Sequence, residues 1–485
     1  MLRVGVVGSG PTAFAALVAL KKLGSEVSID LFDAATGSIT NPKITAQQIS
    51  LQKQYLIDSS NKLSSFQLTK KFGVPFFSKG GWSNYWGTTF LPWTQRDIEL
   101  MGYDYKEFAS AYTEVAKNIA IQGSKDSEIS FYPNYTQYVQ SGQKSRIAQQ
   151  ILENHKRQIK RDSHSGYQFF ESRLGVSQLN TNSSLGCIQC GSCLAGCPYG
   201  HIFNAYNEIL KLNLRNLNEI FGTKITSITY SGEKISLHSG SKSFHDFDYV
   251  FVAAGVIQTA LILSNSIPIK KLSTLETPMT LIPSFYFRKF TKNPEVLNSR
   301  AITLSEIFVS KISPKGNCTG SGQIYSMNPE LRSKLGVLGK WIPDSLARRI
   351  LITMYFFEPN RNNRIEIQNA AQLPRYTNKQ KYQHRRSFRE YRLKLLELGF
   401  VSFPINIFMR KKGDSYHFGG LFEQSSTGVP NRVVDNDGNL KKEFNLPNVY
   451  CVDASSLCEP RPGPITYSLM ANAFRITNKV LGTKE

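Results

Sequence analysis

The sequence lacks any apolar run close to the roughly 20 residues that a membrane-spanning helix needs, and this absence excludes an integral membrane protein. We also expect no secretory leader, because the first apolar strand begins at the second or third residue. No RNA-binding or helix-turn-helix signature is present, which argues against a nucleic-acid partner. We therefore expect a cytoplasmic globular protein, either free in solution or in peripheral contact with a membrane.

Acidic residues are scarce beside basic ones: 36 Asp and Glu stand against 58 Lys and Arg, which gives a formal net charge of +22. Such a charge suits an anionic substrate or lipid surface, or it is spread over the surface for solubility. Basic residues crowd an expected helix within 375–412. Residues 335–357 mix Trp341 and aliphatic side chains with Lys and Arg, and we expect a helix that lies on a membrane surface or packs on a core.

The first 33 residues predict a strand, a glycine turn, a helix and a second strand that ends in an acid. Gly8 allows the tight turn, Gly10 lets a pyrophosphate approach the backbone, and Ala13 lets helix and strand pack closely. Asp33 follows about 20 residues after the turn, at the position where the acid of a dinucleotide-binding motif accepts a hydrogen bond from a ribose hydroxyl. The pattern predicts a dinucleotide site without deciding between FAD and NAD.

Two later segments place glycine and small residues where a backbone can approach a ligand closely: the loop Gly80-Gly81-Trp82-Ser83 and the turn Ala254-Gly255 after a strand ending at Val252. A tight turn with aromatic residues packed around it is the alternative for the loop. The last part of the chain contains the string His417-Phe418-Gly419-Gly420, and Asp453-Ala454 before a closing helix from about 467 to 481. Between the first two segments we expect a helix from Phe203 to about Leu217.

Together these segments resemble the glucose-methanol-choline (GMC) family of FAD-dependent oxidoreductases, because they occur in that family's order. The resemblance implies an α/β fold with a discontinuous FAD-binding domain of Rossmann type and a substrate domain of mainly antiparallel sheet and helices. The implied segments are 1–124, 187–264 and 411–485 for the FAD-binding domain, with the cysteine-rich loop in the second and the active-site histidine in the third, 125–186 for an inserted lobe, and 265–410 for the substrate-binding domain.

The resemblance also implies which residues hold FAD. Gly8, Gly10, Ala13 and Asp33 would hold the ADP half of the cofactor. Gly80, Gly81 and Ser83 would pass beside the isoalloxazine, Ala254 and Gly255 would lie near the adenine side, and Asp453 and Ala454 would border the pyrophosphate and ribityl chain.

His417 matches the family's active-site histidine, which takes the proton of a substrate hydroxyl while hydride passes to the flavin. Where the family usually has a second histidine or an asparagine, this chain has Pro464. Proline can neither donate nor accept a hydrogen bond through its side chain, so the usual two-residue clamp on an alcohol is broken. Tyr467 or Asn472 is a candidate to compensate for it.

Four of the seven cysteines stand within eleven residues, at Cys187, Cys190, Cys193 and Cys197, followed by proline. The spacing is that of the cysteine motif of bacterial ferredoxins, so one interpretation is a 4Fe-4S cluster, with Cys197 or a distant cysteine as its fourth ligand. A structural zinc site and metal-free thiols or a disulfide are the alternatives.

We therefore expect an FAD-dependent oxidoreductase acting on a CH-OH or carbonyl group of a small or lipid-linked molecule, such as a sugar on a carrier. With a cluster present, electrons would pass to an electron carrier. The alternative from another class is a degenerate flavoprotein whose structural FAD supports a binding or assembly role.

Overall fold

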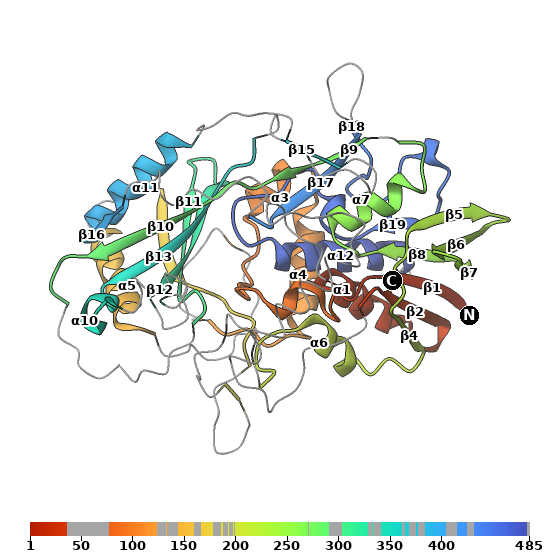
Figure 1. The fold of residues 1–485 in the computed structure, drawn as a ribbon, viewed down its shortest axis with the longest axis horizontal. Coiled ribbons are helices and arrows are strands. Elements are labelled where there is room, and N and C mark those ends of the chain that lie inside the picture. The colour runs from red at the N-terminus through yellow and green to blue at the C-terminus, as the bar shows by residue number, and fades with distance from the viewer. Residues whose placement is uncertain are drawn as a thin grey trace.

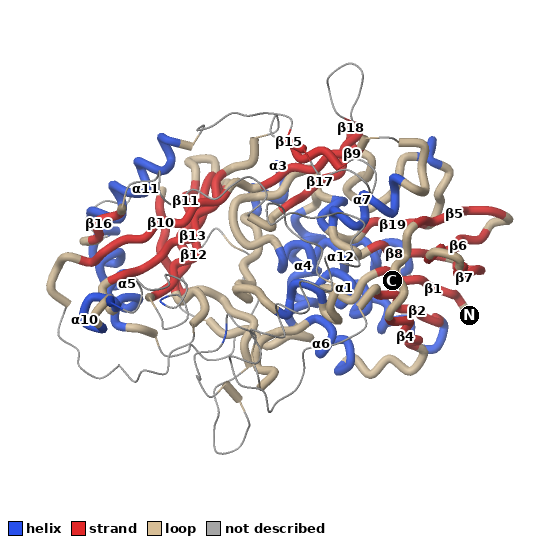
Figure 2. The backbone as a smooth tube through the Cα atoms, in the orientation of Figure 1, coloured by secondary structure: helices blue, strands red, loops and turns tan. Residues whose placement is uncertain are grey.

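The computed structural model describes residues 1–35, 77–123, 132, 144–159, 166–177, 186–187, 193, 197, 199–269, 271–290, 303–327, 332, 341–360, 364–367, 375–376, 384–403, 415–423 and 431–482. A five-stranded parallel sheet lies at one end and a six-stranded antiparallel sheet at the other (Figures 1 and 2). The strands of the parallel sheet, in spatial order, are β19 (Val449–Cys451), β8 (Tyr249–Val252), β1 (Leu2–Val7), β2 (Val27–Asp33) and β4 (Leu217–Phe221).

The N-terminal unit forms as its sequence pattern predicts. Strand β1 buries its last four residues, and helix α1 (Pro11–Leu20) buries every residue after Pro11. Because α1 is apolar all round, it needs a cover on the side away from the sheet. The closing helix α12 (Thr466–Leu481) supplies that cover, with Met470, Ala471 and Ala473 buried in the shared core. The two ends of the chain are therefore joined in one core.

The six-stranded sheet packs one face against two helices, α5 (Arg146–Ile159) and α11 (Arg385–Glu397). Its strands, in spatial order, are β16 (Phe400–Ser402), β10 (Met279–Tyr286), β13 (Ile350–Phe357), β12 (Cys318–Ser326), β11 (Ile307–Ile312) and β3 (Tyr167–Glu171). Helix α5 and strand β3 come from the segment 125–186, so the described part of that segment contributes to this sheet.

Two smaller sheets complete the architecture. A second antiparallel sheet contains β15 (Arg375–Tyr376), β14 (Arg364–Ile367), β9 (Leu272–Glu276), β17 (Phe418–Glu423) and β18 (Asn431–Arg432). Only Thr277 and Pro278 separate β9 from β10, so one short connection joins the two antiparallel sheets. A meander of β5 (Ser227–Ser231), β6 (Lys234–Ser239) and β7 (Lys242–Phe247) packs on the parallel sheet, where a Cβ on Gly5 would touch Leu237 and Phe247.

Two sequence predictions of helices are wrong. The helix expected to reach Leu217 ends at Lys211 as α6 (Ala205–Lys211), and Leu217 begins the outer parallel strand β4. Within 335–357 the residues from Ile350 onward form β13, a strand between β10 and β12. In both cases pairing with strands far away in the sequence outweighs local helix preference. No helix in the described ranges is long and apolar enough to cross a membrane.

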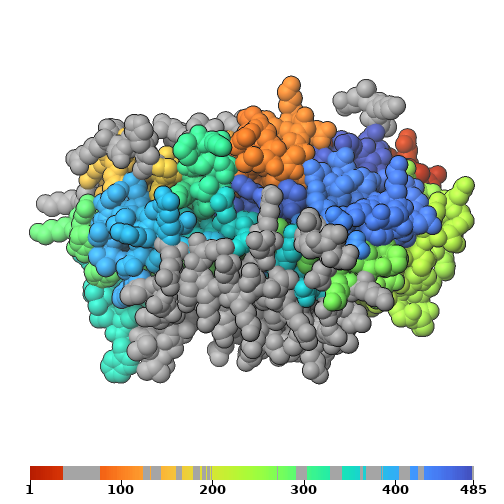
Figure 3. Space-filling model, turned by 90° about the horizontal axis from the view of Figure 1, so that it is seen from above, coloured from red at the N-terminus to blue at the C-terminus, as the bar shows by residue number. Residues whose placement is uncertain are grey.

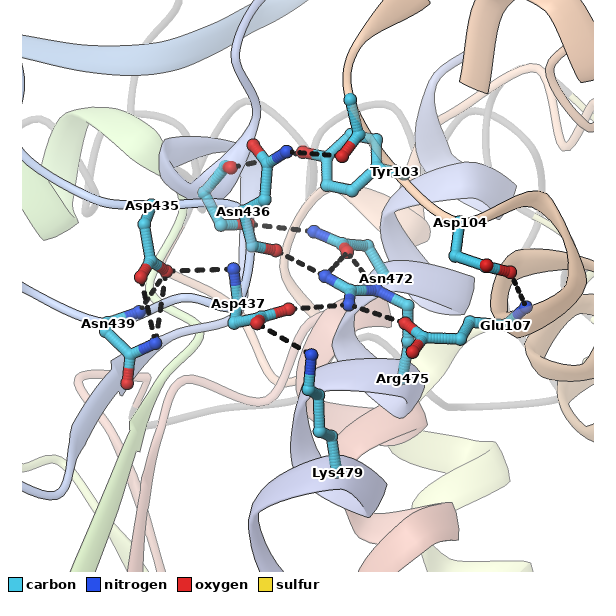
Figure 4. Close-up of polar contacts among 12 residues, drawn as sticks. Tyr103, Asp104, Glu107, Asp435, Asn436, Asp437, Asn439, Asn472, Arg475 and Lys479 are labelled. Carbon is cyan, nitrogen blue, oxygen red and sulfur yellow. Dashed lines mark hydrogen bonds and ion pairs between the residues drawn. The ribbon is translucent and has the colours of Figure 1, made fainter. Parts of the chain in front are cut away.

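A polar network fixes the closing helix to the rest of the domain (Figure 4). Arg475 of α12 is 6% exposed and donates hydrogen bonds to the side chains of Asn472, Asp437 and Glu107, the last on helix α4 (Tyr105–Ala116). It also donates to the carbonyl oxygen of Asn436. Figure 3 accordingly shows early residues (orange) beside C-terminal ones (blue) on one face.

We expect Arg475→Met to lower the free energy of unfolding by about 2 kcal/mol, because hydrogen bonds to charged and buried partners are lost while the apolar volume is kept. Lys479→Met is the matched control: Lys479 also pairs with Asp437, at 2.8 Å, but its side chain is 51% exposed. Its loss should cost less than about 0.5 kcal/mol. Urea unfolding measures both variants, and equal losses would contradict the role given to Arg475.

Candidate active site

The glycine turn between β1 and α1 lies against the second strand-to-helix turn. Gly8 has φ +106°, and a Cβ there would lie 2.5 Å from the carbonyl oxygen of Ala253 and 3.2 Å from the Cα of Ala254. A larger residue at position 8 would therefore collide with backbone. The Ala253 N–H donates to the Val7 carbonyl at 2.8 Å, which holds the two turns together. Gly8 and Ala254, predicted from separate motifs, are thus neighbours.

Asp33 closes β2 directly beside this turn. Its Oδ2 accepts hydrogen bonds from the N–H and the hydroxyl of Ser9, at 2.9 and 2.5 Å, and its Oδ1 accepts from the N–H of Ala35 at 2.8 Å. Burial raises the pKa of Asp33, and the hydrogen bonds from Ser9 and Ala35 oppose that shift. An ionised carboxylate offers about four acceptor positions. These three bonds leave Oδ1 able to accept one more donor.

Ser9 connects the turn to the loop that carries Gly80 and Gly81. Its hydroxyl oxygen accepts a hydrogen bond from the Gly80 N–H at 2.9 Å. Gly80 and Gly81 have φ +90° and +55°, and a Cβ on Gly81 would lie 3.8 Å from the Cα of Gly10. The structure therefore brings Gly8, Gly10, Gly80 and Gly81 to one place.

Ser83 serves this loop internally. Its hydroxyl donates to the Gly80 carbonyl at 2.6 Å and accepts from the N–H of Ala205 at 2.9 Å, at the start of α6. The side chain is buried, at 2% exposed. Ser83 therefore fixes the glycine loop against α6 through these two bonds.

Asp453 joins the second turn to the C-terminal segment. Its Oδ2 accepts from the N–H of Gly255 at 2.8 Å and from the hydroxyl of Thr259, and its Oδ1 accepts from the N–H and the hydroxyl of Ser455, at 2.9 and 2.6 Å. Burial raises its pKa, against these hydrogen bonds. Four donors match the capacity of the carboxylate. Asp453 therefore joins the turn at Gly255 to the segment that contains Ala454, and no sequence motif indicated Thr259 or Ser455 as its partners.

His417 lies immediately before β17, and its ring stacks on Phe356 of β13, with 4.6 Å between ring centroids and an angle of 14° between planes. Its carbonyl oxygen accepts from the Thr277 N–H at 2.9 Å. Burial lowers the pKa of His417 from 6.5 to about 4, and a hydrogen bond with the Gly463 backbone acts in the opposite direction. The imidazole is neutral near pH 7, and its Nδ1 is buried and has no hydrogen-bond partner among the described residues.

The segment that replaces the usual second side chain is held by a buried ion pair. Arg461 binds Asp97 of α3 (Gln95–Leu100), with Nε and Nη2 at 2.9 and 2.5 Å from Oδ1, and both side chains are almost completely buried. Gly463 follows with φ +111°, and a Cβ there would lie 2.6 Å from the Ser321 hydroxyl oxygen. The next residue, Pro464, is buried.

Neither Tyr467 nor Asn472 is placed to replace the missing second side chain of the substrate clamp. The Tyr467 hydroxyl donates to the Tyr112 carbonyl at 2.7 Å, and the amide of Asn472 bonds the Ser456 hydroxyl at 3.0 Å while its oxygen accepts from Arg475. Both are buried contacts within the α12 core. His417 instead contacts Phe356, Thr277, the Ser415 hydroxyl and the Gly463 backbone, and no sequence motif indicated Phe356 or Thr277.

An aromatic pair links the glycine loop to the histidine. Trp82, in the 3₁₀ turn η2 (Gly81–Asn84), and Tyr416, next to His417, have ring centroids 5.3 Å apart. They are 38% and 55% exposed. A continuous set of contacts therefore runs from Asp33 through Ser9 and Gly80 to the neighbour of His417.

The cysteine run is only partly described, since Cys190 lies outside the described residues. Cys193 is buried with Leu174, Val176 and Leu304, and Cys187 packs against this apolar cluster. Burial raises the pKa of Cys193 to about 12, and the neighbouring thiols of Cys187 and Cys197 act in the same direction. Within the described ranges, no three His, Cys, Asp or Glu side chains are grouped to hold a metal ion.

Comparison with known proteins finds no matching family model and no similar curated sequence. Among solved structures, pyridoxine 4-oxidase from Mesorbium loti matches with a TM-score of 0.61 at 12% sequence identity, over 100% of both chains. That enzyme is a GMC oxidoreductase. The expected α/β fold class is therefore confirmed: the chain has a parallel sheet and antiparallel sheets and shares the fold of that enzyme.

Proposed function

We propose that the chain is an FAD-dependent oxidoreductase that acts on a CH-OH or carbonyl group of an organic molecule. The observation that carries this proposal is the set of contacts from the N-terminal glycine turn, through the Gly80-Gly81 loop, to His417. The N-terminal turn, the Gly80-Gly81 loop and the segment with Tyr416 and His417 meet there, as a cofactor that contacts several segments requires. The fold shared with an oxidase supports the same class of reaction.

The residues at the turn fit the ADP half of FAD. Among the described residues, an added Cβ on Gly10 would meet nothing within 4 Å, so the described part of the chain leaves space in front of this glycine. No described side chain caps helix α1, which leaves its first N–H groups for phosphate oxygens. Asp33 retains one acceptor position for a ribose hydroxyl. The donor and acceptor set is therefore the one that a dinucleotide needs.

The chemistry at the other end follows from the protonation state of His417. Bound FAD would supply the acceptor for the hydride of the substrate carbon. The neutral imidazole takes the hydroxyl proton as the carbon–oxygen bond becomes double, and it returns that proton when a carbonyl is reduced. Phe356 fixes the ring plane by stacking, and Thr277 fixes the backbone at His417.

Pro464 favours a second candidate function, a binding or assembly role with FAD as a structural component. The proline is buried beside Gly463, and its side chain cannot clamp a substrate hydroxyl. Anaerobic photoreduction of the flavin, followed by reoxidation with an artificial acceptor and tests with alcohols and aldehydes, separates the two functions. A flavin that no substrate reduces or reoxidises supports the binding role.

The iron–sulfur relay stays a prediction from the spacing of Cys187, Cys190, Cys193 and Cys197. Among the described residues, which leave out Cys190, no group of three His, Cys, Asp or Glu side chains is placed to hold a metal ion, so the structure does not support this relay. Iron and acid-labile sulfide measured on anaerobically purified protein test it directly. Absence of both would leave the metal-free thiols or zinc.

Gly10→Val tests the cofactor site itself. The position has φ −75° and open space, so valine fits the fold and costs less than about 1 kcal/mol as a poorer N-cap. Its side chain would occupy the place of the pyrophosphate, and we expect FAD affinity to fall by about tenfold or more while the melting temperature of the apoprotein changes little. Titration of apoprotein with FAD, followed by flavin fluorescence, measures the effect. Unchanged affinity would remove the turn from the cofactor site.

A further inference from the structure

The two faces of the six-stranded sheet differ in what covers them. Ile282, Leu351 and Tyr355 point to the face that packs against α5 and α11. On β10 and β13 the alternate positions point to the other face. These side chains, called here the apolar strip, are all apolar and partly exposed: Leu281, Pro283, Phe285, Ile350, Ile352 and Met354.

The strand register makes the apolar strip continuous. Leu281 is opposite Met354, Pro283 is opposite Ile352, and Phe285 is opposite Ile350, so each pair contributes to the same patch. Edge strand β16 widens it. Val401 pairs with Phe285, and Phe403 donates its N–H to the Pro283 carbonyl at 3.1 Å. Both of these side chains are 51% exposed.

The inner end of the strip reaches the candidate active site. The next pair along the strands is Met279 and Phe356, both buried, and Phe356 stacks on His417. From Ile350 to Phe356 a strand extends about 20 Å. The strip is thus a track of the length of a long hydrocarbon chain, with a histidine at its inner end.

The outer end of the strip carries positive charge. Arg288 and Lys289 follow β10, and Arg348 precedes β13, and all three are exposed. Arg349 donates to the carbonyls of Tyr286 and Arg288, which ties the two chain segments together. An anionic group at the end of a bound chain would meet these cations.

We propose that the apolar strip seats the hydrocarbon chain of a lipid-like substrate, with its hydroxyl at His417 and an anionic group at the outer cations. This inference rests on the proposed function, because His417 defines which end reacts. Continuity with a buried residue at the inner end favours a single lipid molecule over a bilayer surface, which would meet only the exposed part. Removing such apolar area from water stabilises the complex in proportion to the area buried.

Binding of a dansyl-labelled undecanoic acid to the purified holoenzyme tests the proposal, read as the rise in dansyl emission. We expect the wild type to bind it, and Phe403→Glu to weaken binding by about tenfold or more, because the carboxylate opposes chain and anion alike. Ile352→Glu, nearer the centre of the strip, should act in the same direction. The matched control is Leu393→Glu on α11, where an equally exposed leucine (51%) lies on the helix that covers the other face.

Absence of wild-type binding, or equal binding by Phe403→Glu and Leu393→Glu, would overturn the proposal. A second outcome would also overturn it: the wild type does not bind the probe but binds vesicles or forms dimers, and Phe403→Glu abolishes that association. The apolar strip would then be a membrane or subunit interface. Probe binding by a protein that takes up no FAD would remove the proposed enzyme function and keep the lipid site, so the two failures are distinguishable.

Discussion

Replacement of His417 by alanine is expected to leave FAD bound and to slow reduction of the flavin by substrate by roughly a hundredfold or more, the usual size of a general-base contribution. The reason is geometric as well as chemical: the imidazole is held by its stack on Phe356 and is neutral near pH 7. Anaerobic stopped-flow absorbance at the flavin band measures the rate constant. An unchanged rate would remove His417 from the reaction.

His384 offers a matched control for this substitution. It stacks on Phe357, with 4.5 Å between centroids and an angle of 16°, and burial lowers its pKa to about 4 as well. Adjacent residues of a strand point to opposite faces, so His384 lies on the α11 side of the sheet. His384→Ala should therefore alter stability to a similar extent without changing the rate of flavin reduction.

The pH dependence of the same rate follows from the lowered pKa of His417. Only the neutral imidazole can accept a proton, so the rate falls as the ring becomes protonated. With a pKa of about 4 in place of 6.5, the acid limb of the profile lies near pH 4 and the rate is level between about pH 5 and 7. A limb near pH 6.5 would contradict the buried environment of the ring.

Replacement of Arg461 by methionine is expected to lower the free energy of unfolding by about 3–5 kcal/mol, because it leaves Asp97 as an unpaired charge in the interior. Asp97 is 0% exposed and also accepts hydrogen bonds from the Thr94 hydroxyl at 2.7 Å and from the Cys318 N–H at 3.1 Å. Chemical denaturation of the apoprotein measures the loss. A decrease below about 1 kcal/mol would show that the pair is dispensable.

Arg96, which precedes Asp97 in helix α3, supplies the control for Arg461. Arg96 pairs with Glu99 at 3.3 Å, but its side chain is 44% exposed, so Arg96→Met should cost less than about 0.5 kcal/mol. The double variant Asp97→Asn with Arg461→Met should be more stable than the sum of the single losses, because the buried charge of Asp97 is then removed together with its partner.

The predictions from sequence were most accurate where one short segment contains its own pattern. The strand, glycine turn and helix at the N-terminus needed only the spacing of Gly8, Gly10 and the following apolar residues. They were wrong where a distant partner decides the structure: Leu217 starts a strand because β2 pairs with it, and Ile350 onward forms a strand between β10 and β12. Local composition at those positions does not distinguish strand from helix.

The sequence by itself determined the glycine segments and their order, because each segment is local and its backbone chemistry depends on its own residues. The type of fold and the candidate histidine followed from the family resemblance that this order carries. Only the tertiary structure decided how these segments cooperate. The bond from Ser9 to Gly80 spans 71 positions, that from Thr259 to Asp453 spans 194, and that from Arg461 to Asp97 spans 364. Contacts over such separations leave no periodicity in the sequence, since folding alone brings their two halves together.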